Sequence, residues 1–127
     1  MTITSTTVES NVALNRLSGS FLDTGTPDAV VIDVGFLPRY VKWVNTTTAV
    51  MWEWFTGMAN GTTLKTSSAG AKTLDTADVA ISIAQTVAQG ALTADAYLPV
   101  RVKGSFQVTV AAAIISASDQ CYYEIRE

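Results

Sequence analysis

The chain has 127 residues, of which 48% are hydrophobic and 15% charged, and its formal net charge is −3. This length suits one domain with a single core, and the hydrophobic content excludes an ordinary disordered chain. The eight basic residues are scattered and histidine is absent, which argues against a nucleic-acid partner and removes the commonest general base and metal ligand.

The N-terminal part is rich in Thr, Ser and Asn, and we expect residues 1–20 to form an N-terminal arm or a short edge strand. Residues 21–127 are expected to form a single β-sandwich domain. Within them, residues 25–28 (GTPD) are typical of a turn, and the β-branched run at residues 29–34 predicts a strand.

Residues 39–44 and 49–55 predict two strands of a β-hairpin joined by a loop of about four residues. Because side chains alternate along a strand, Trp52 and Trp54 share one face of the second strand, and Glu53 lies on the other. We expect Glu53 to be an edge or interface charge paired across the hairpin with a basic residue, Arg39 or Lys42.

Further strands are predicted at residues 62–66, 71–74, 79–83, 97–102, 105–110 and 121–125. Residues 76–90 leave two interpretations open, because the alternation at 79–83 favours a strand whereas Val79, Ile83 and Val87 also fit helical spacing. The total of seven to nine short strands is typical of an all-β sandwich or barrel.

Catalytic and metal-binding patterns are missing from the sequence, which contains no phosphate-loop, dinucleotide, zinc or nucleophile-elbow motif. The acidic residues are isolated, and we expect the closest pair, Asp75 and Asp78, to stabilise a turn. The single cysteine, Cys121, is expected to be a small buried hydrophobe. We therefore expect no enzyme, no cofactor and no metal site. No stretch has the length and hydrophobicity of a membrane helix or the pattern of a secretion signal, so we expect no membrane partner.

An aromatic cluster is the most informative feature, since five aromatic side chains fall within the sixteen residues 40–55. Three interpretations are open: core packing, an anchor for a protein partner, or a platform for a carbohydrate. The candidates for a protein interface are Arg39, Tyr40, Trp43, Trp52, Glu53, Trp54 and Phe55.

The sequence around this cluster resembles a group of small structural proteins encoded in tailed-phage genomes, which share an "FxPRxVxxxN…xEWxxGMA…TxLKT" pattern. The matching segments are FLPRYVKWVNTT (36–47), MWEWFTGMA (51–59), TLKT (63–66), GAKTLDT (70–76), KGSFQVTV (103–110) and the tyrosine pair Tyr122-Tyr123. The resemblance extends over residues 30–125.

This resemblance implies a virion component, first of all a capsid decoration (cement) protein with a jelly-roll or related antiparallel β-sandwich. Such a protein binds the outside of the assembled head and stabilises contacts between subunits of the major capsid protein. We also expect a homo-oligomer, for which a dimer and a trimer both satisfy capsid symmetry, and the missing secretion signal predicts assembly in the host cytoplasm. The alternative is a tail- or fibre-associated virion protein involved in host attachment.

Overall fold

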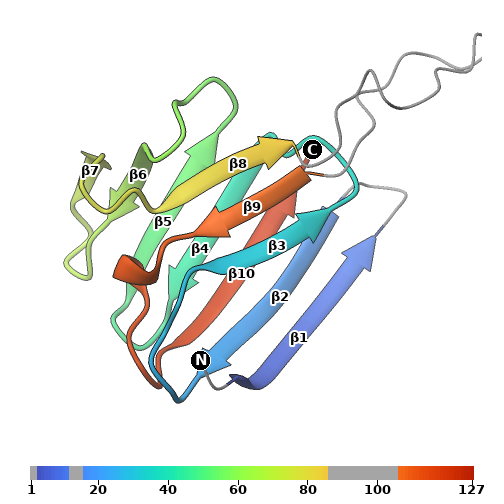
Figure 1. Ribbon diagram of the computed structural model, residues 1–127. Coiled ribbons are helices and arrows are strands. Elements are labelled where there is room, and N and C mark those ends of the chain that lie inside the picture. The colour runs from blue at the N-terminus through green and yellow to red at the C-terminus, as the bar shows by residue number, and fades with distance from the viewer. Residues whose placement is uncertain (1–2, 12–15, 86–105) are drawn as a thin grey trace, which may run out of the picture.

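The computed structural model describes residues 3–11, 16–85 and 106–127, with only the backbone course given for 3–11 (Figure 1). The strand predicted at residues 97–102 lies outside the described residues. The described part is all-β, as the sequence predicts, with ten strands and one short 3-10 helix. These are β1 (Ile3–Asn11), β2 (Arg16–Asp23), β3 (Val30–Val34), β4 (Tyr40–Asn45), β5 (Val50–Phe55), β6 (Thr63–Thr66), β7 (Lys72–Asp75), β8 (Ile81–Gln85), β9 (Phe106–Val110), η3 (Ala112–Ile114) and β10 (Gln120–Arg126).

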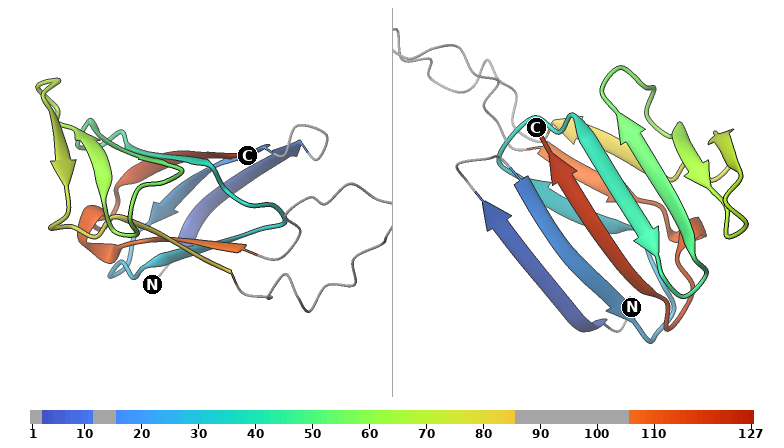
Figure 2. Two further views of the ribbon diagram at one scale, coloured as in Figure 1. Left: turned by 90° about the horizontal axis from the view of Figure 1, so that it is seen from above. Right: turned by 180° about the vertical axis from the view of Figure 1, so that it is seen from behind.

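The strands form two antiparallel sheets, one in the order β1-β2-β10-β4-β5-β6-β7 and one in the order β3-β9-β8. The small sheet lies over one face of the large sheet, so that the described part has two layers (Figure 2). Strands β2 and β10 pair in the large sheet, and strands β3 and β9 pair in the small sheet. Because β3 follows β2 and β10 follows β9 in the chain, the chain passes between the layers from β2 to β3 and again from β9 to β10. The C-terminal strand therefore lies in the middle of the large sheet.

The core lies between the layers and is built by alternation along the strands. In β4, Val41 and Trp43 are buried whereas the intervening Lys42 is only half-buried, which is the two-residue periodicity of a sheet with one face on a core. Trp43 stacks on Tyr123 of β10, with ring centroids 5.7 Å apart and planes inclined by 7°. This stacking ties the centre of the large sheet together from within the core.

The predicted hairpin of β4 and β5 is confirmed, with six consecutive residue pairs from Tyr40–Phe55 to Asn45–Val50. Its turn is fixed by the carboxamide oxygen of Asn45, which accepts hydrogen bonds from the backbone N–H groups of Thr47 (3.1 Å) and Thr48 (3.2 Å). Short side chains that bond to nearby backbone in this way stabilise turns. The hairpin thus fixes which residues of β4 lie opposite those of β5.

Strand geometry, rather than a helix, is confirmed for residues 81–85, while residues 86–90 lie outside the described part. The strand β8 is an edge of the small sheet, and the loop after β5 covers it. The carboxamide of Asn60 donates to the carbonyl of Ile83 (2.9 Å) and accepts from its N–H (3.0 Å), and Gly61 N–H bonds to the carbonyl of Ile81 (2.9 Å). These contacts occupy backbone groups that would otherwise attract another strand.

At the N-terminus, β1 forms one edge of the large sheet and pairs with β2. The strand β2 runs from Arg16 to Asp23 and therefore continues across residue 20. The exposure of the side chains differs between its two ends, since Arg16 is exposed and both Phe21 and Asp23 are buried. Residues 3–11 and 16–20 are in this way part of the large sheet.

Candidate interaction surface

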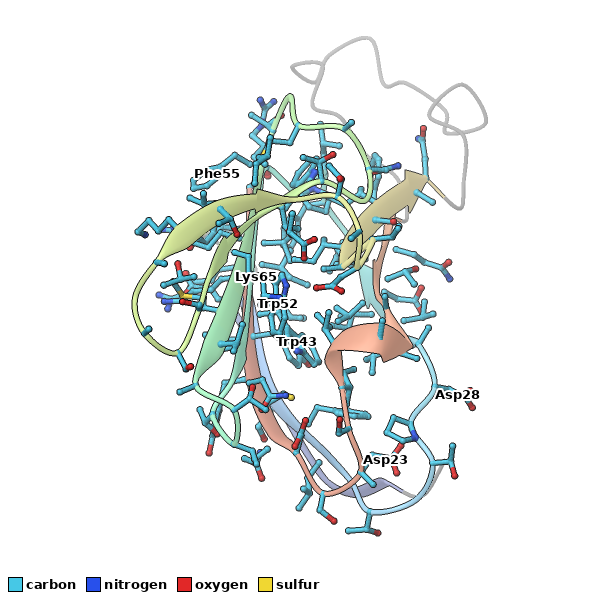
Figure 3. All side chains as sticks on the ribbon, turned by 90° about the vertical axis from the view of Figure 1, so that its left-hand side faces the viewer. Asp23, Asp28, Trp43, Trp52, Phe55 and Lys65 are labelled. Carbon is cyan, nitrogen blue, oxygen red and sulfur yellow. The ribbon has the colours of Figure 1, made fainter. Side chains whose placement is uncertain are left out.

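The three tryptophans of the aromatic cluster lie in the core. Trp43, Trp52 and Trp54 are 0%, 4% and 7% exposed, and Figure 3 shows Trp43 and Trp52 between the two sheets, with Phe55 on the opposite side of the large sheet. The expectation that these tryptophans face a partner is therefore corrected in favour of core packing. Trp52 and Trp54 share a face because they are two positions apart in β5, and Trp43 lies on the same face because it pairs with Trp52. The small sheet covers this face (Figure 3).

The opposite side of the large sheet, which we call the outer face, carries the other half of each strand. Three rows of paired residues, which together we call the grid, cross β10, β4 and β5 on this face. The rows are Tyr122–Val44–Met51, Glu124–Lys42–Glu53 and Arg126–Tyr40–Phe55. Of the seven predicted interface residues, Tyr40, Glu53 and Phe55 belong to these rows, and Arg39 is exposed at the start of β4 beside them.

A chain of side-chain contacts connects the rows. Glu124 forms ion pairs with Arg16 of β2 (3.3 Å) and with Arg126 (3.1 Å). The guanidinium of Arg126 lies over the ring of Tyr40, 4.4 Å from its centroid, which is the geometry of a cation–π contact. The hydroxyl of Tyr40 then donates a 2.7 Å hydrogen bond to Glu53. These contacts hold the side chains of four neighbouring strands in defined positions.

Tyr40 is the residue on which this chain of contacts depends. Burial, followed by the hydrogen bond to the Glu53 carboxylate and its charge, raises the pKa of Tyr40 to about 12. The phenol therefore remains a donor throughout the physiological range. Its ring also meets Phe55 edge-on at 5.2 Å between centroids, and Phe55 is 42% exposed. The pair places an aromatic edge on the outer face.

Lys42 occupies the middle of the grid, opposite Glu53 on one side and Glu124 on the other. The expected pairing of Glu53 with Arg39 or Lys42 is not what the structure contains, because Tyr40 takes the Glu53 carboxylate. The ammonium of Lys42 forms no hydrogen bond or ion pair with any residue that the structure describes. A hollow of about 170 Å³ opens beside it, lined by Lys42, Val44, Tyr122, Tyr123 and Glu124.

The outer side of the small sheet has a different composition. Its outward positions in β3 are Val31, which is 52% exposed, and Asp33. Their neighbours in β9 are Thr109 and Gln107, and β8 adds Ser82 opposite Thr109. This side has no aromatic residue among its described strand positions, so the exposed aromatic surface of the two sheets lies on the large one.

The remaining polar residues singled out in the sequence have structural roles. Asp75 accepts hydrogen bonds from the N–H groups of Ala77 (3.1 Å) and Asp78 (3.3 Å) and from the indole of Trp52 (3.3 Å), which confirms the predicted turn. Burial raises the pKa of Asp75, but the hydrogen bonds from Asp78, Trp52 and Ala77 outweigh it and hold the pKa below its usual value. Lys65 pairs with Asp78 at 3.4 Å. The contacts of Asp75 and Asp78 therefore close the end of the core beside Trp52.

Cys121 is fully buried, as predicted. Burial, and then the nearby Asp119 carboxylate, raise the pKa of its thiol to about 12, which makes it a poor nucleophile.

Across residues 3–11, 16–85 and 106–127, no group of three or more His, Cys, Asp or Glu side chains is placed to hold a metal ion. In the same residues no helix has the length and hydrophobicity needed to cross a membrane.

Sequence reasoning missed the three residues that β10 contributes to these rows. Tyr122, Glu124 and Arg126 lie more than sixty residues from β5 in the chain and come beside β4 only through sheet pairing. The alternation of burial in β10, with Cys121, Tyr123 and Ile125 buried, is visible in the sequence as a strand signal, but it does not identify the neighbouring strands. Comparison with known protein families, with curated proteins and with solved structures gave no significant match.

Proposed function

We propose that this protein is a phage capsid decoration protein that binds the outside of the assembled head and stabilises contacts between major capsid subunits. The observation that carries this proposal is the outer face of the large sheet, which combines exposed aromatic side chains with ordered charges and has no partner among the described residues. Aromatic residues and arginine are the side chains in which binding energy concentrates at protein interfaces. The resemblance of residues 30–125 to phage structural proteins supplies the identity of the partner.

We further propose that the two layers are a β-sandwich of jelly-roll type. The support is the pairing of β2 with β10 and of β3 with β9, because consecutive strands that cross together between sheets are a feature of folded-over antiparallel sandwiches. The meander from β4 to β7 within one sheet distinguishes this chain from a regular eight-stranded arrangement. A rigid sandwich of this kind presents its outer face without reorganisation, which lowers the cost of docking.

The small size of the hollow beside Lys42 also favours a structural role. The hollow beside Lys42 has a volume of about 170 Å³, whereas pockets for small-molecule ligands usually measure about 300–1,000 Å³. A sheet face with a hollow of this size suits another protein surface. A dimer or trimer that contacts a symmetric shell through several subunits at once attaches more firmly through avidity.

The test is binding of the purified protein to expanded, undecorated heads, measured by co-sedimentation and quantitative mass spectrometry. We expect saturation at high copy number. The Phe55→Ala and Tyr122→Ala variants should bind more weakly, and Val31→Ala, which removes an equally exposed side chain from the opposite side, should bind like wild type. Binding at few copies to tails or to a single vertex would instead support attachment to the tail. Absence of the protein from finished particles would refute both.

A further inference from the structure

The outer face differs in charge from the rest of the molecule. The positions on this side of the large sheet hold four basic and three acidic residues, hence a net charge of +1, in a chain whose formal charge is −3. These residues are Arg16, Lys42, Lys72, Arg126, Glu9, Glu53 and Glu124. On the outer side of the small sheet, Asp33 is the sole charged residue among the described strand positions. The outer face is thus the more basic of the two outer sides of an acidic protein.

The basic residues of this face are not equally available. Arg16 and Arg126 are held by Glu124, and Arg126 also lies over the ring of Tyr40. Since the carboxylate of Glu53 is bonded to Tyr40 as well, neither acidic neighbour of Lys42 depends on Lys42 for a partner. Lys42 is half-buried, and its ammonium is in consequence a cation at the centre of the face with no hydrogen-bonded partner among the described residues.

The hollow beside Lys42 has the size and lining for one side chain. Its volume of about 170 Å³ holds several water molecules, each of which takes about 30 Å³ in the liquid. Val44 and the half-exposed Tyr122 supply apolar surface, and Lys42 supplies charge. The carboxylate of Glu124 also lines the hollow, but it is neutralised by two guanidinium groups. A carboxylate that enters the hollow meets apolar walls for its methylene groups and an ammonium for its oxygen atoms.

We propose that the outer face docks on an acidic protein surface, and that the hollow beside Lys42 receives an aspartate or glutamate side chain of that partner. This inference rests on the proposed function, for which it specifies the chemistry of the capsid surface. Complementary charge at an interface selects the partner and fixes its register. A single charged contact in a desolvated position is enough to control affinity.

The first test compares Lys42→Met with Lys72→Met in binding to expanded heads. Methionine keeps the length of the lysine side chain and removes its charge, and Lys72 is a matched control because it is exposed on the same face at the sheet edge. We expect Lys42→Met to weaken binding by about tenfold or more, as for the loss of one charged hydrogen bond. We expect Lys72→Met to change the affinity by less than about threefold. Equal affinity of wild type and Lys42→Met would overturn the inference and leave the decoration role intact.

A second test needs no phage particle and so separates the two proposals. The free protein, labelled with ¹⁵N, is titrated with a short peptide of alternating Asp and Ala, and in parallel with its Asn counterpart. We expect amide shifts at Lys42, Val44 and Tyr122 with the acidic peptide alone, and their loss in Lys42→Met. Shifts that are scattered over the surface, or that are the same with both peptides, would refute the acidic contact even if heads bind the protein.

The occupant of the face is also tested by sedimentation velocity of the free protein. We expect the outer face to be open in solution, so that Phe55→Ala and Lys42→Met leave the sedimentation coefficient unchanged. A dimer or trimer that dissociates on either substitution would assign the face to a second copy of this chain and overturn the inference.

Discussion

Trp54 and Phe55 are adjacent in β5 and lie on opposite sides of the large sheet, the first 7% exposed in the core and the second 42% exposed on the outer face. On the proposed function, Trp54 contributes to stability and Phe55 to recognition. Strand β5 carries bulky apolar side chains on both sides, and the core of the protein covers only one of these sides. The other side is the surface on which we place the partner.

Replacement of these two residues should give opposite patterns. We expect Trp54→Ala to lower the free energy of unfolding by about 3–5 kcal/mol, because it leaves a large cavity in the core. Phe55→Ala should lower it by about 1 kcal/mol, the scale of an aromatic pair at the surface. Urea denaturation followed by tryptophan fluorescence measures both. Similar losses for the two variants would contradict the assignment of faces.

The buried pair of Asn45 and Asp119 should be essential for stability. Asn45 donates a 2.7 Å hydrogen bond to the Asp119 carboxylate, which also accepts from the N–H of Ser116 at 2.9 Å. We expect Asn45→Ala to cost about 1–3 kcal/mol, since it removes one donor from a buried carboxylate. Asn45→Asp should cost more because it sets two carboxylates side by side. Thr48→Ala, in the exposed part of the same turn, is the control and should change stability by less than about 0.5 kcal/mol.

The link from Tyr40 to Glu53 predicts a pH dependence at the alkaline end. Burial and the Glu53 carboxylate raise the pKa of Tyr40 from 10.0 to about 12, so the folded state binds the phenolic proton more tightly than the unfolded state. The resulting stability is fully present below about pH 10 and is lost as the pH rises through 12. The difference between the absorbance titrations of wild type and Tyr40→Phe at 295 nm should show one phenol that ionises near pH 12.

Glu53→Gln is the matched variant for this titration. It removes the negative charge and should lower the pKa of Tyr40 toward 10.0, because the charged acceptor is among the causes of the raised value. A Tyr40 phenol that titrates at the same pH with Gln at position 53 would show that burial alone raises the pKa.

Cys121 should report on opening of the core. Its thiol is fully buried, and its pKa is raised to about 12 by burial and by Asp119, so the reactive thiolate is scarce in the folded state. We expect a thiol reagent at about pH 8 to label the native protein only as fast as the core opens. The destabilised Asn45→Ala variant should label faster. Immediate labelling of the native wild type would contradict the burial of β10 between β2 and β4.

The local pattern of the sequence predicts the hairpin of β4 and β5, the turns after Asn45 and Asp75, and the burial of Cys121. It also predicts which residues of β5 share a side. These features depend on neighbours in the chain, because alternation along a strand and side-chain bonds to nearby backbone act over a few residues. The local sequence pattern could not decide whether Trp52 and Trp54 face the core or a partner, because alternation separates the two faces of a strand without saying which one is covered.

The tertiary structure alone decided that the small sheet covers the tryptophan side, and that β10 enters between β2 and β4. That insertion brings Glu124 and Arg126 beside Lys42 and Tyr40, and so creates both the charged grid and the hollow. Pairing between strands distant in the chain depends on the total burial that the whole fold achieves, and no short segment contains that information. The sequence by itself thus determined the strands and their two sides, and long-range pairing determined the surface.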